Sequence, residues 1–125
     1  MASGLIMASG IRNVRINLSQ QCFDLLADAM CDFSKRTGRF QTMRMTVQTA
    51  CERLEDHRFS PAEFEQFLCE FPIDGEIGVW LEINPTWGSA YDGLRQKLKE
   101  FTGKQGIDKV MIPFAVYLAT RQHLF

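Results

Sequence analysis

Hydrophobic and polar residues alternate without a break over residues 13–19. Val14, Ile16 and Leu18 are hydrophobic, and each of them stands between two polar residues. Successive side chains of a β-strand point to opposite faces, so this pattern predicts a strand with one buried and one solvent-exposed face. Ser19 follows the last hydrophobic position and is a favourable N-cap for a helix.

Two amphipathic helices are predicted after this strand. The first covers residues 20–36, and Gly38 just beyond it is a typical helix stop. The second runs from about Met43 to Asp56, with Thr42 as its cap. The hydrophobic positions at helical spacing are Phe23, Leu26, Met30 and Phe33 in the first helix and Met43, Val47, Ala50, Cys51 and Leu54 in the second.

The rest of the chain is predicted to hold a third helix, a second strand and two further helices. Ser60-Pro61-Ala62-Glu63 combines an N-cap serine, a first-turn proline and a capping glutamate, which predicts a helix that ends before Pro72. Val79–Asn84 alternates like the first strand. The remaining elements are a turn at Pro85–Ser89, a helix over 91–101 and a helix from about Val110 to His123.

The two halves of the chain resemble each other. Phe23-Asp24-Leu25-Leu26 matches Tyr91-Asp92-Gly93-Leu94, and Met43 matches Met111 at the same spacing of 68 positions. An internal duplication would explain this, although two units of one architecture would also give such matches by chance. The expected class is α+β and mainly helical. The expected organisation is a disordered tail at 1–10, a strand–helix–helix unit at 11–58, a linking helix at 59–72, and at 73–125 either a second such unit or an oligomerisation or partner-binding region.

Composition excludes several functional classes. No hydrophobic run approaches the roughly 20 residues of a membrane span, and the first ten residues lack the features of a signal peptide, so a cytoplasmic protein is expected. There is no Gly-x-Ser-x-Gly motif, and two histidines offer few general bases, so we expect no enzyme, no catalytic residue and no cofactor. Without a Cys-x-x-Cys pair, the cysteines are predicted to be buried free thiols rather than metal ligands.

The charges are unevenly distributed, although the net charge is only −1. Residues 34–49 contain four basic residues and no acid, whereas residues 59–86 contain six acids and no Lys or Arg. The first stretch could face an anion and the second could not. Both could equally be ordinary solvated faces.

The strand at 13–19 needs a pairing partner, because a lone strand cannot satisfy its own backbone hydrogen bonds. Its partner is either the same strand of a second chain or Val79–Asn84 of its own chain. An antiparallel ribbon of two strands fits the major groove of B-DNA, and Asn13, Arg15 and Asn17 would lie on its exposed face. In the second arrangement Trp80, Glu82 and Asn84 would join that face. Phosphate repels the carboxylate of Glu82, so the homodimeric ribbon is preferred for DNA binding.

These features resemble the ribbon-helix-helix repressors, a family that includes the Met and Arc repressors. The matching residues are the strand at 13–18, Ser19, the segment Lys35-Arg36-Thr37-Gly38-Arg39 and the pattern of the second helix. The resemblance implies that alternate strand residues read bases and that the start of the second helix grips phosphate. It therefore points to seven DNA-binding residues, namely Asn13, Arg15, Asn17, Arg39, Thr42, Met43 and Arg44.

The predicted function is sequence-specific binding of double-stranded DNA, as a transcriptional repressor or DNA-processing accessory of the kind that plasmids and phages carry. The protein would act as a homodimer or a single-chain pseudo-dimer. One alternative is an interaction module, such as an inhibitor or an antitoxin-like partner, that uses the acidic stretch at 59–86 with Trp80 and Trp87. Another is that the polar residues only protect an edge strand from aggregation.

Overall fold

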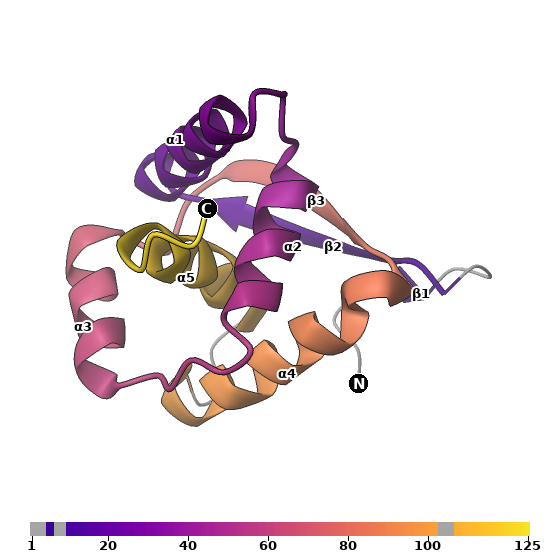
Figure 1. Ribbon diagram of the computed structural model, residues 1–125. Helices are drawn as coiled ribbons and strands as arrows, with labels where there is room; N and C mark the ends of the chain where they lie inside the picture. Colours follow the sequence, from indigo (N-terminus) through magenta and orange to yellow (C-terminus); the bar gives the residue numbers. More distant parts are fainter. Residues whose placement is uncertain (1–4, 7–9, 103–106) are drawn as a thin grey trace.

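The computed structural model describes residues 5–6, 10–102 and 107–125 and has the expected α+β, mainly helical architecture (Figure 1). Five helices pack against a small antiparallel sheet. No helix of the described residues is long and apolar enough to cross a membrane. In chain order the elements are β1 (Leu5–Ile6), β2 (Arg12–Leu18), α1 (Gln20–Thr37), α2 (Met43–Arg53), α3 (Pro61–Glu70), β3 (Ile77–Ile83), α4 (Pro85–Thr102) and α5 (Ile107–Arg121).

The first strand of the sequence, β2, pairs with β3 of the same chain. The two strands are antiparallel and in register from the pair Arg12–Ile83 to the pair Leu18–Ile77. Of the two partners that the sequence allows, the structure thus has the intramolecular one. The preference for a ribbon built from two chains is wrong for β2. The seven residues of β3 already pair with the backbone hydrogen-bonding groups of β2 along one edge.

A short strand before β2 was not expected. Leu5 pairs with Asn13 and Ile6 with Arg12, which gives the strand order β1-β2-β3. The prediction of a disordered tail at 1–10 is therefore wrong for these two residues. Residues 1–4 and 7–9 of that tail lie outside the described residues.

The alternating pattern of each paired strand produces one buried and one exposed face. Val14, Ile16 and Leu18 of β2 are at most 6% exposed, and Leu81 and Ile83 of β3 are 1% exposed. The polar residues between them are exposed. The hydrophobic face packs on the helices, and α5 contacts β2 while α2 contacts β3.

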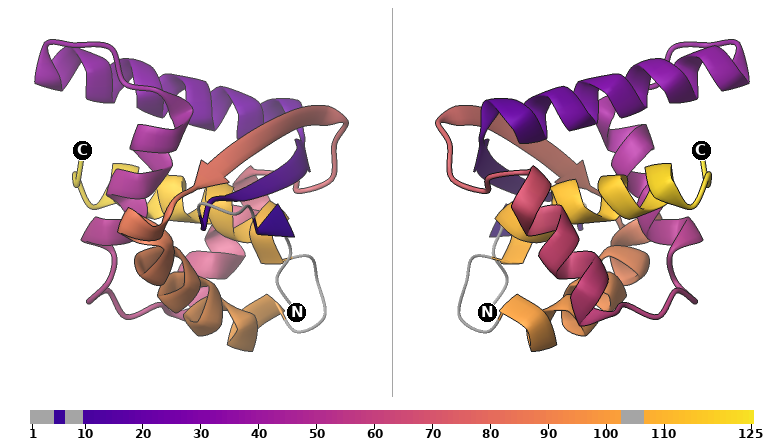
Figure 2. Two further views of the ribbon diagram at one scale, coloured as in Figure 1. Left: turned by 90° about the vertical axis from the view of Figure 1, so that its right-hand side faces the viewer. Right: turned by 90° about the vertical axis from the view of Figure 1, so that its left-hand side faces the viewer.

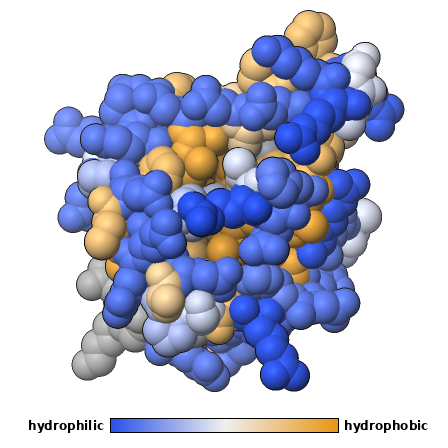
Figure 3. All heavy atoms as spheres, turned by 60° about the vertical axis from the view of Figure 1, so that its left-hand side comes forward, coloured by the Kyte–Doolittle hydropathy of each residue, from blue (hydrophilic) through white to orange (hydrophobic). Residues whose placement is uncertain are grey.

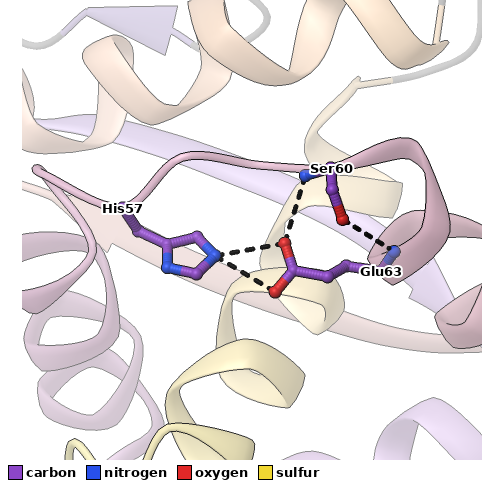
Figure 4. Close-up of polar contacts among 3 residues, drawn as sticks. All are labelled: His57, Ser60 and Glu63. Atoms are coloured by element: carbon purple, nitrogen blue, oxygen red, sulfur yellow. Dashed lines mark hydrogen bonds and ion pairs between the residues drawn. The ribbon is translucent and has the colours of Figure 1, made fainter.

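Most helix ends follow the predicted capping residues. Ser19 and Thr42 accept hydrogen bonds from backbone N–H groups in the first turns of α1 and α2, and Gly38 ends α1 with a φ of 73°. At α3, Ser60 and Glu63 form the reciprocal capping box (Figure 4). His57 Nε2 lies 3.2 Å from both carboxylate oxygens of Glu63, so the same side chain caps the helix and holds the preceding loop.

Three predicted helix boundaries are wrong. Pro85–Ser89 is the start of α4 rather than a turn, because proline suits the first helical position and Asn84 Oδ1 accepts from the backbone of Thr86. Asn84 therefore lies outside β3. Helix α5 begins at Ile107, three residues earlier than expected, which places Pro113 in its interior. Helix α2 ends at Arg53 instead of Asp56.

Helix α5 lies at the centre of the molecule, and both side views show it at mid-height, with α1 above it and α4 below it (Figure 2). Every residue from Val110 to Ala119 is buried. The helix contacts α1, α2, α3 and α4, which explains why its hydrophobic residues occur all round rather than in one stripe. The structure thus encloses the last helix in a shell formed by the rest of the chain.

The two halves of the chain have matching dimensions. Strands β2 and β3 have seven residues each, helices α1 and α4 have 18 each, and both kinds of element start 65 positions apart. At this spacing Leu26 corresponds to Tyr91, and both side chains are buried. The spacing of 68 positions from the sequence pairs Tyr91 with Phe23, which is 39% exposed. The structural correspondence is therefore one helical turn away from the predicted one.

The four cysteines are free thiols, but only two of them are buried as predicted. Cys22 and Cys51 lie in the core, whereas Cys31 and Cys69 are exposed. Burial raises the pKa of the Cys51 thiol to about 12, so this side chain acts as a small hydrophobic residue.

Candidate nucleic-acid interface

The exposed side of the paired strands β2 and β3, called the ribbon face below, carries six positions. It contains the predicted residues Asn13, Arg15 and Asn17 from β2 and, opposite them, Glu82, Trp80 and Gly78 from β3. All six are exposed, and Trp80 is 64% exposed. The structure therefore brings three of the seven predicted residues together on one ribbon.

Arg15 and Trp80 form the central pair of this face. The guanidinium carbon of Arg15 lies 5.1 Å from the centre of the Trp80 ring, a cation–π contact that keeps the guanidinium spread over the indole. A Cβ built at Gly78 would lie 3.4 Å from both Arg15 Nη2 and Asn17 Oδ1. The absence of a side chain at Gly78 thus leaves room for two polar groups to lie across the ribbon.

The amino end of α2 holds the other predicted residues, on a separate element. Thr42 is exposed and caps the helix, Met43 packs on the core, and Arg44 Nη1 donates to Gln48 Oε1 at 2.9 Å. Arg39 is exposed in the loop that precedes the helix. The first turn of α2 contains no acid, so its free N–H groups and the helix dipole favour an anion there.

The amino end of α5 differs, because it holds a carboxylate of the protein itself. Asp108 stands in the first turn and is 7% exposed. Its Oδ1 accepts a hydrogen bond from the Tyr91 hydroxyl and lies 3.2 Å from Arg95 Nε. Burial, and then the nearby Asp108 carboxylate, raises the pKa of Tyr91, so the hydroxyl remains a donor.

Sequence reasoning missed Gly78 and the contact between Trp80 and Arg15, although the single-chain alternative did place Trp80 on the ribbon face. The alternation of residues 79–83 placed Trp80 on the exposed side of a strand, but its contact with Arg15 depends on a register that the sequence does not specify. The other arginine of β2, Arg12, is not part of the face, because it pairs with Asp92 at 2.9 Å and lies over the Tyr91 ring.

A hollow between α1, α5 and the end of α3, called the acidic groove below, is a second surface with a distinct character. Leu25, Ala29 and Phe71 form its apolar part, and its acids are Asp24, Asp28, Asp32 and Glu70. On the side of the molecule where these helices meet, hydrophobic residues are visible in recesses between hydrophilic ones (Figure 3).

The acid-rich stretch at 59–86 does not form one surface. Its acids are divided among α3, the α3–β3 connection and β3, and only Glu70 lines the acidic groove. Asp74 pairs with Lys109, and Glu63 belongs to the capping box. Trp87, which was expected to be exposed together with Trp80, is 1% exposed and packs edge-on against Tyr91.

Comparisons of the chain with known protein families, with curated proteins and with solved structures found no match.

Proposed function

We propose that this protein binds double-stranded DNA without catalysing a reaction, as a regulator or a DNA-processing accessory, by inserting the ribbon face into the major groove. The observation that carries the proposal is the antiparallel β2–β3 ribbon with Arg15 and two asparagines on its exposed side. A ribbon of this kind has the width of the major groove, where base edges offer a distinct pattern for each base pair.

The chemistry of the ribbon face suits base recognition. Arginine can donate two hydrogen bonds to guanine, and asparagine can pair with adenine through its amide. Trp80 keeps the guanidinium of Arg15 extended, which reduces the entropy that the side chain would lose on binding. The amino end of α2, with Arg39 and Arg44, provides the phosphate contacts that orient a DNA-binding protein.

Replacing Arg15 by alanine tests the proposal. A bidentate arginine–guanine contact contributes about 1–3 kcal/mol, so we expect the Kd for a site selected from random duplexes to rise roughly 5- to 150-fold. The affinity for unselected DNA should fall less, because phosphate contacts dominate there. Fluorescence anisotropy with labelled duplexes at several salt concentrations measures both values.

Arg58→Ala is the matched control, because Arg58 is an exposed arginine in the α2–α3 connection and the substitution removes the same charge. Its Kd should stay within about twofold of the wild type. Equal losses in the two variants would show that Arg15 contributes only charge. An unchanged Kd for Arg15→Ala would show that the ribbon face does not read DNA.

The acidic groove favours a second candidate function, the binding of a protein partner. Acids border an apolar strip on α1 and at the end of α3, a combination that suits a basic amphipathic segment whose apolar side faces the strip. The acids of α1 are at the spacing of one helical turn, so a bound helix could meet several of them.

A charge reversal separates this candidate from DNA binding. Asp28→Lys combined with Asp32→Lys should abolish retention of one protein from a nuclease-treated host extract, whereas Glu65→Lys, an exposed α3 acid outside the groove, should not. Mass spectrometry identifies the retained protein, and its direct affinity for both variants is then measured. Equal affinity for the two variants would remove the acidic groove as the binding surface.

A further inference from the structure

The register of the ribbon gives it a centre. Arg15 pairs with Trp80, and three more pairs extend on each side to the ends of the two seven-residue strands. A two-fold axis through this central pair would place each residue of β2 on the residue of β3 that is 65 positions later in the sequence. The starts of α1 and α4 are separated by the same 65 positions. The backbone of β2 and β3 is therefore arranged like that of a symmetric dimer, apart from the short strand β1, which pairs with β2 alone.

The side chains on the ribbon face break this symmetry at every position. The axis would exchange Asn13 with Gly78, Arg15 with Trp80, and Asn17 with Glu82. An amide is thus matched with no side chain, a cation with an aromatic ring, and an amide with a carboxylate. None of the three pairs of equivalent positions presents the same hydrogen-bonding groups to DNA.

The helix ends break the symmetry as well. The first turn of α2 contains no acid and has Thr42 and Arg44 beside it, whereas the first turn of α5 contains Asp108. The carboxylate of Asp108 is buried against Tyr91 and Arg95, so an internal anion already benefits from the dipole of α5. A phosphate therefore meets more favourable electrostatics at α2 than at the described amino end of α5.

We propose that one chain of this protein recognises one asymmetric DNA site, which contains no inverted repeat and whose two halves are read by different chemistry. The inference rests on the proposed DNA binding and specifies the class of sequence that is bound. A palindromic site has identical half-sites, and reading both halves equally requires identical groups on the two strands of the ribbon. This ribbon does not have them.

The same chemistry indicates which bases each half should contain. Arg15 and the two asparagines of β2 favour guanine and adenine, respectively. Glu82 can only accept hydrogen bonds, which favours the amino group of cytosine, and the Trp80 ring suits contact with a thymine methyl group. Phosphate repels the Glu82 carboxylate, which lowers the affinity for DNA. A cytosine at the matching position offsets this loss with a hydrogen bond, so Glu82 adds selectivity.

Selection from a random duplex library, followed by native mass spectrometry of the complex with the enriched duplex, tests the inference. We expect a motif without inverted symmetry and a complex of one chain with one duplex. An inverted repeat would overturn the inference but leave DNA binding intact. Failure to enrich any sequence would overturn both.

A variant with a symmetric ribbon face provides the decisive comparison. This variant combines Gly78→Asn, Trp80→Arg and Glu82→Asn, so that β3 has the same outward residues as β2. All three positions are exposed, and a Cβ at Gly78 makes only ordinary contacts. The motif selected by this variant should be an inverted repeat, and its affinity for the wild-type site should fall by about tenfold or more. Selection of the unchanged wild-type motif would overturn the inference.

The single substitution Glu82→Asn tests the same inference if the triple variant does not fold. It should replace the preference for cytosine by one for adenine at a single position of the motif, whereas Glu65→Asn, at an exposed position of α3, should leave the motif unchanged. A motif that does not respond to Glu82→Asn would show that β3 does not contact bases.

Discussion

Replacing Gly75 by alanine is expected to destabilise the protein severely, by about 3 kcal/mol or more. Gly75 lies in the connection between α3 and β3, where this segment crosses the junction of β2 and α1. A Cβ at this position would lie 2.1 Å from the carbonyl oxygen of Leu18 and 2.3 Å from Ser19 Cα. Both are backbone atoms at a strand end and a helix cap, so no side-chain rotation can relieve the clash.

The consequences would spread beyond the contact itself. Ser19 Oγ donates to the carbonyl oxygen of Pro72 at 2.5 Å, and Leu18 pairs with Ile77, so the connection is fixed to β2 on both sides of Gly75. Moving the connection away from Ser19 would lengthen the hydrogen bond to Pro72 and disturb the last pair of the ribbon. Stability and DNA binding should therefore decline together in this variant.

Gly93→Ala is the matched control for Gly75→Ala. Gly93 lies in α4, and a Cβ there meets nothing within 4 Å, so alanine should stabilise the helix by about 0.5–1 kcal/mol. Urea unfolding followed by circular dichroism measures both free energies. A Gly75→Ala variant as stable as the wild type would show that the connection does not approach β2 this closely.

The local elements of the fold could be predicted because each has a local physical cause. The strict alternation around Ile16 determines which face of β2 is buried, and the capping groups of Ser19, Thr42 and Ser60 determine where three helices begin. Gly38 ends α1 because it adopts a positive φ. These features depend on neighbours within a few positions, which a sequence displays directly.

Features that depend on distant contacts could not be predicted in the same way. Val79–Asn84 and a second copy of residues 13–18 offer the same alternating pattern, so the sequence does not distinguish the two pairings of β2. Pro85 and Asn84 suit a turn as well as the start of a helix, and the packing of Trp87 and Tyr91 in the core adds a long-range preference for the helix. The contact of Trp80 with Arg15 likewise follows from the register.

The intramolecular pairing also changes the significance of Glu82. In a homodimeric ribbon Glu82 could be turned away from DNA, whereas here it lies opposite Asn13 on the ribbon face. A carboxylate at this place lowers general affinity for phosphate but adds selectivity among bases. The net charge of −1 provides no overall positive field, so the proposed DNA binding would have to rely on a few specific groups.

Phe114→Ala is expected to have the second large effect on stability, a loss of about 3–5 kcal/mol. Phe114 of α5 is 1% exposed, and its ring centre lies 5.2 Å from those of both Phe64 and Phe67 of α3. It also lies 5.7 Å from the ring centre of Phe59 in the α2–α3 connection. Alanine would leave a cavity at the point where α3 packs on the central helix.

Phe40→Ala makes the same substitution at a side chain that is 97% exposed in the α1–α2 loop, and its effect should stay within about 0.5 kcal/mol. Phe114→Leu retains part of the buried volume and should give an intermediate loss, which keeps the comparison measurable if the alanine variant does not fold. Urea midpoints of the three variants rank these losses. A loss below about 1 kcal/mol for Phe114→Ala would mean that α3 is not held to α5 by this aromatic cluster.

The ribbon face lies on β2 and β3 rather than on α5. At temperatures where Phe114→Leu remains folded, the Kd of this variant for the selected DNA site should therefore match that of the wild type.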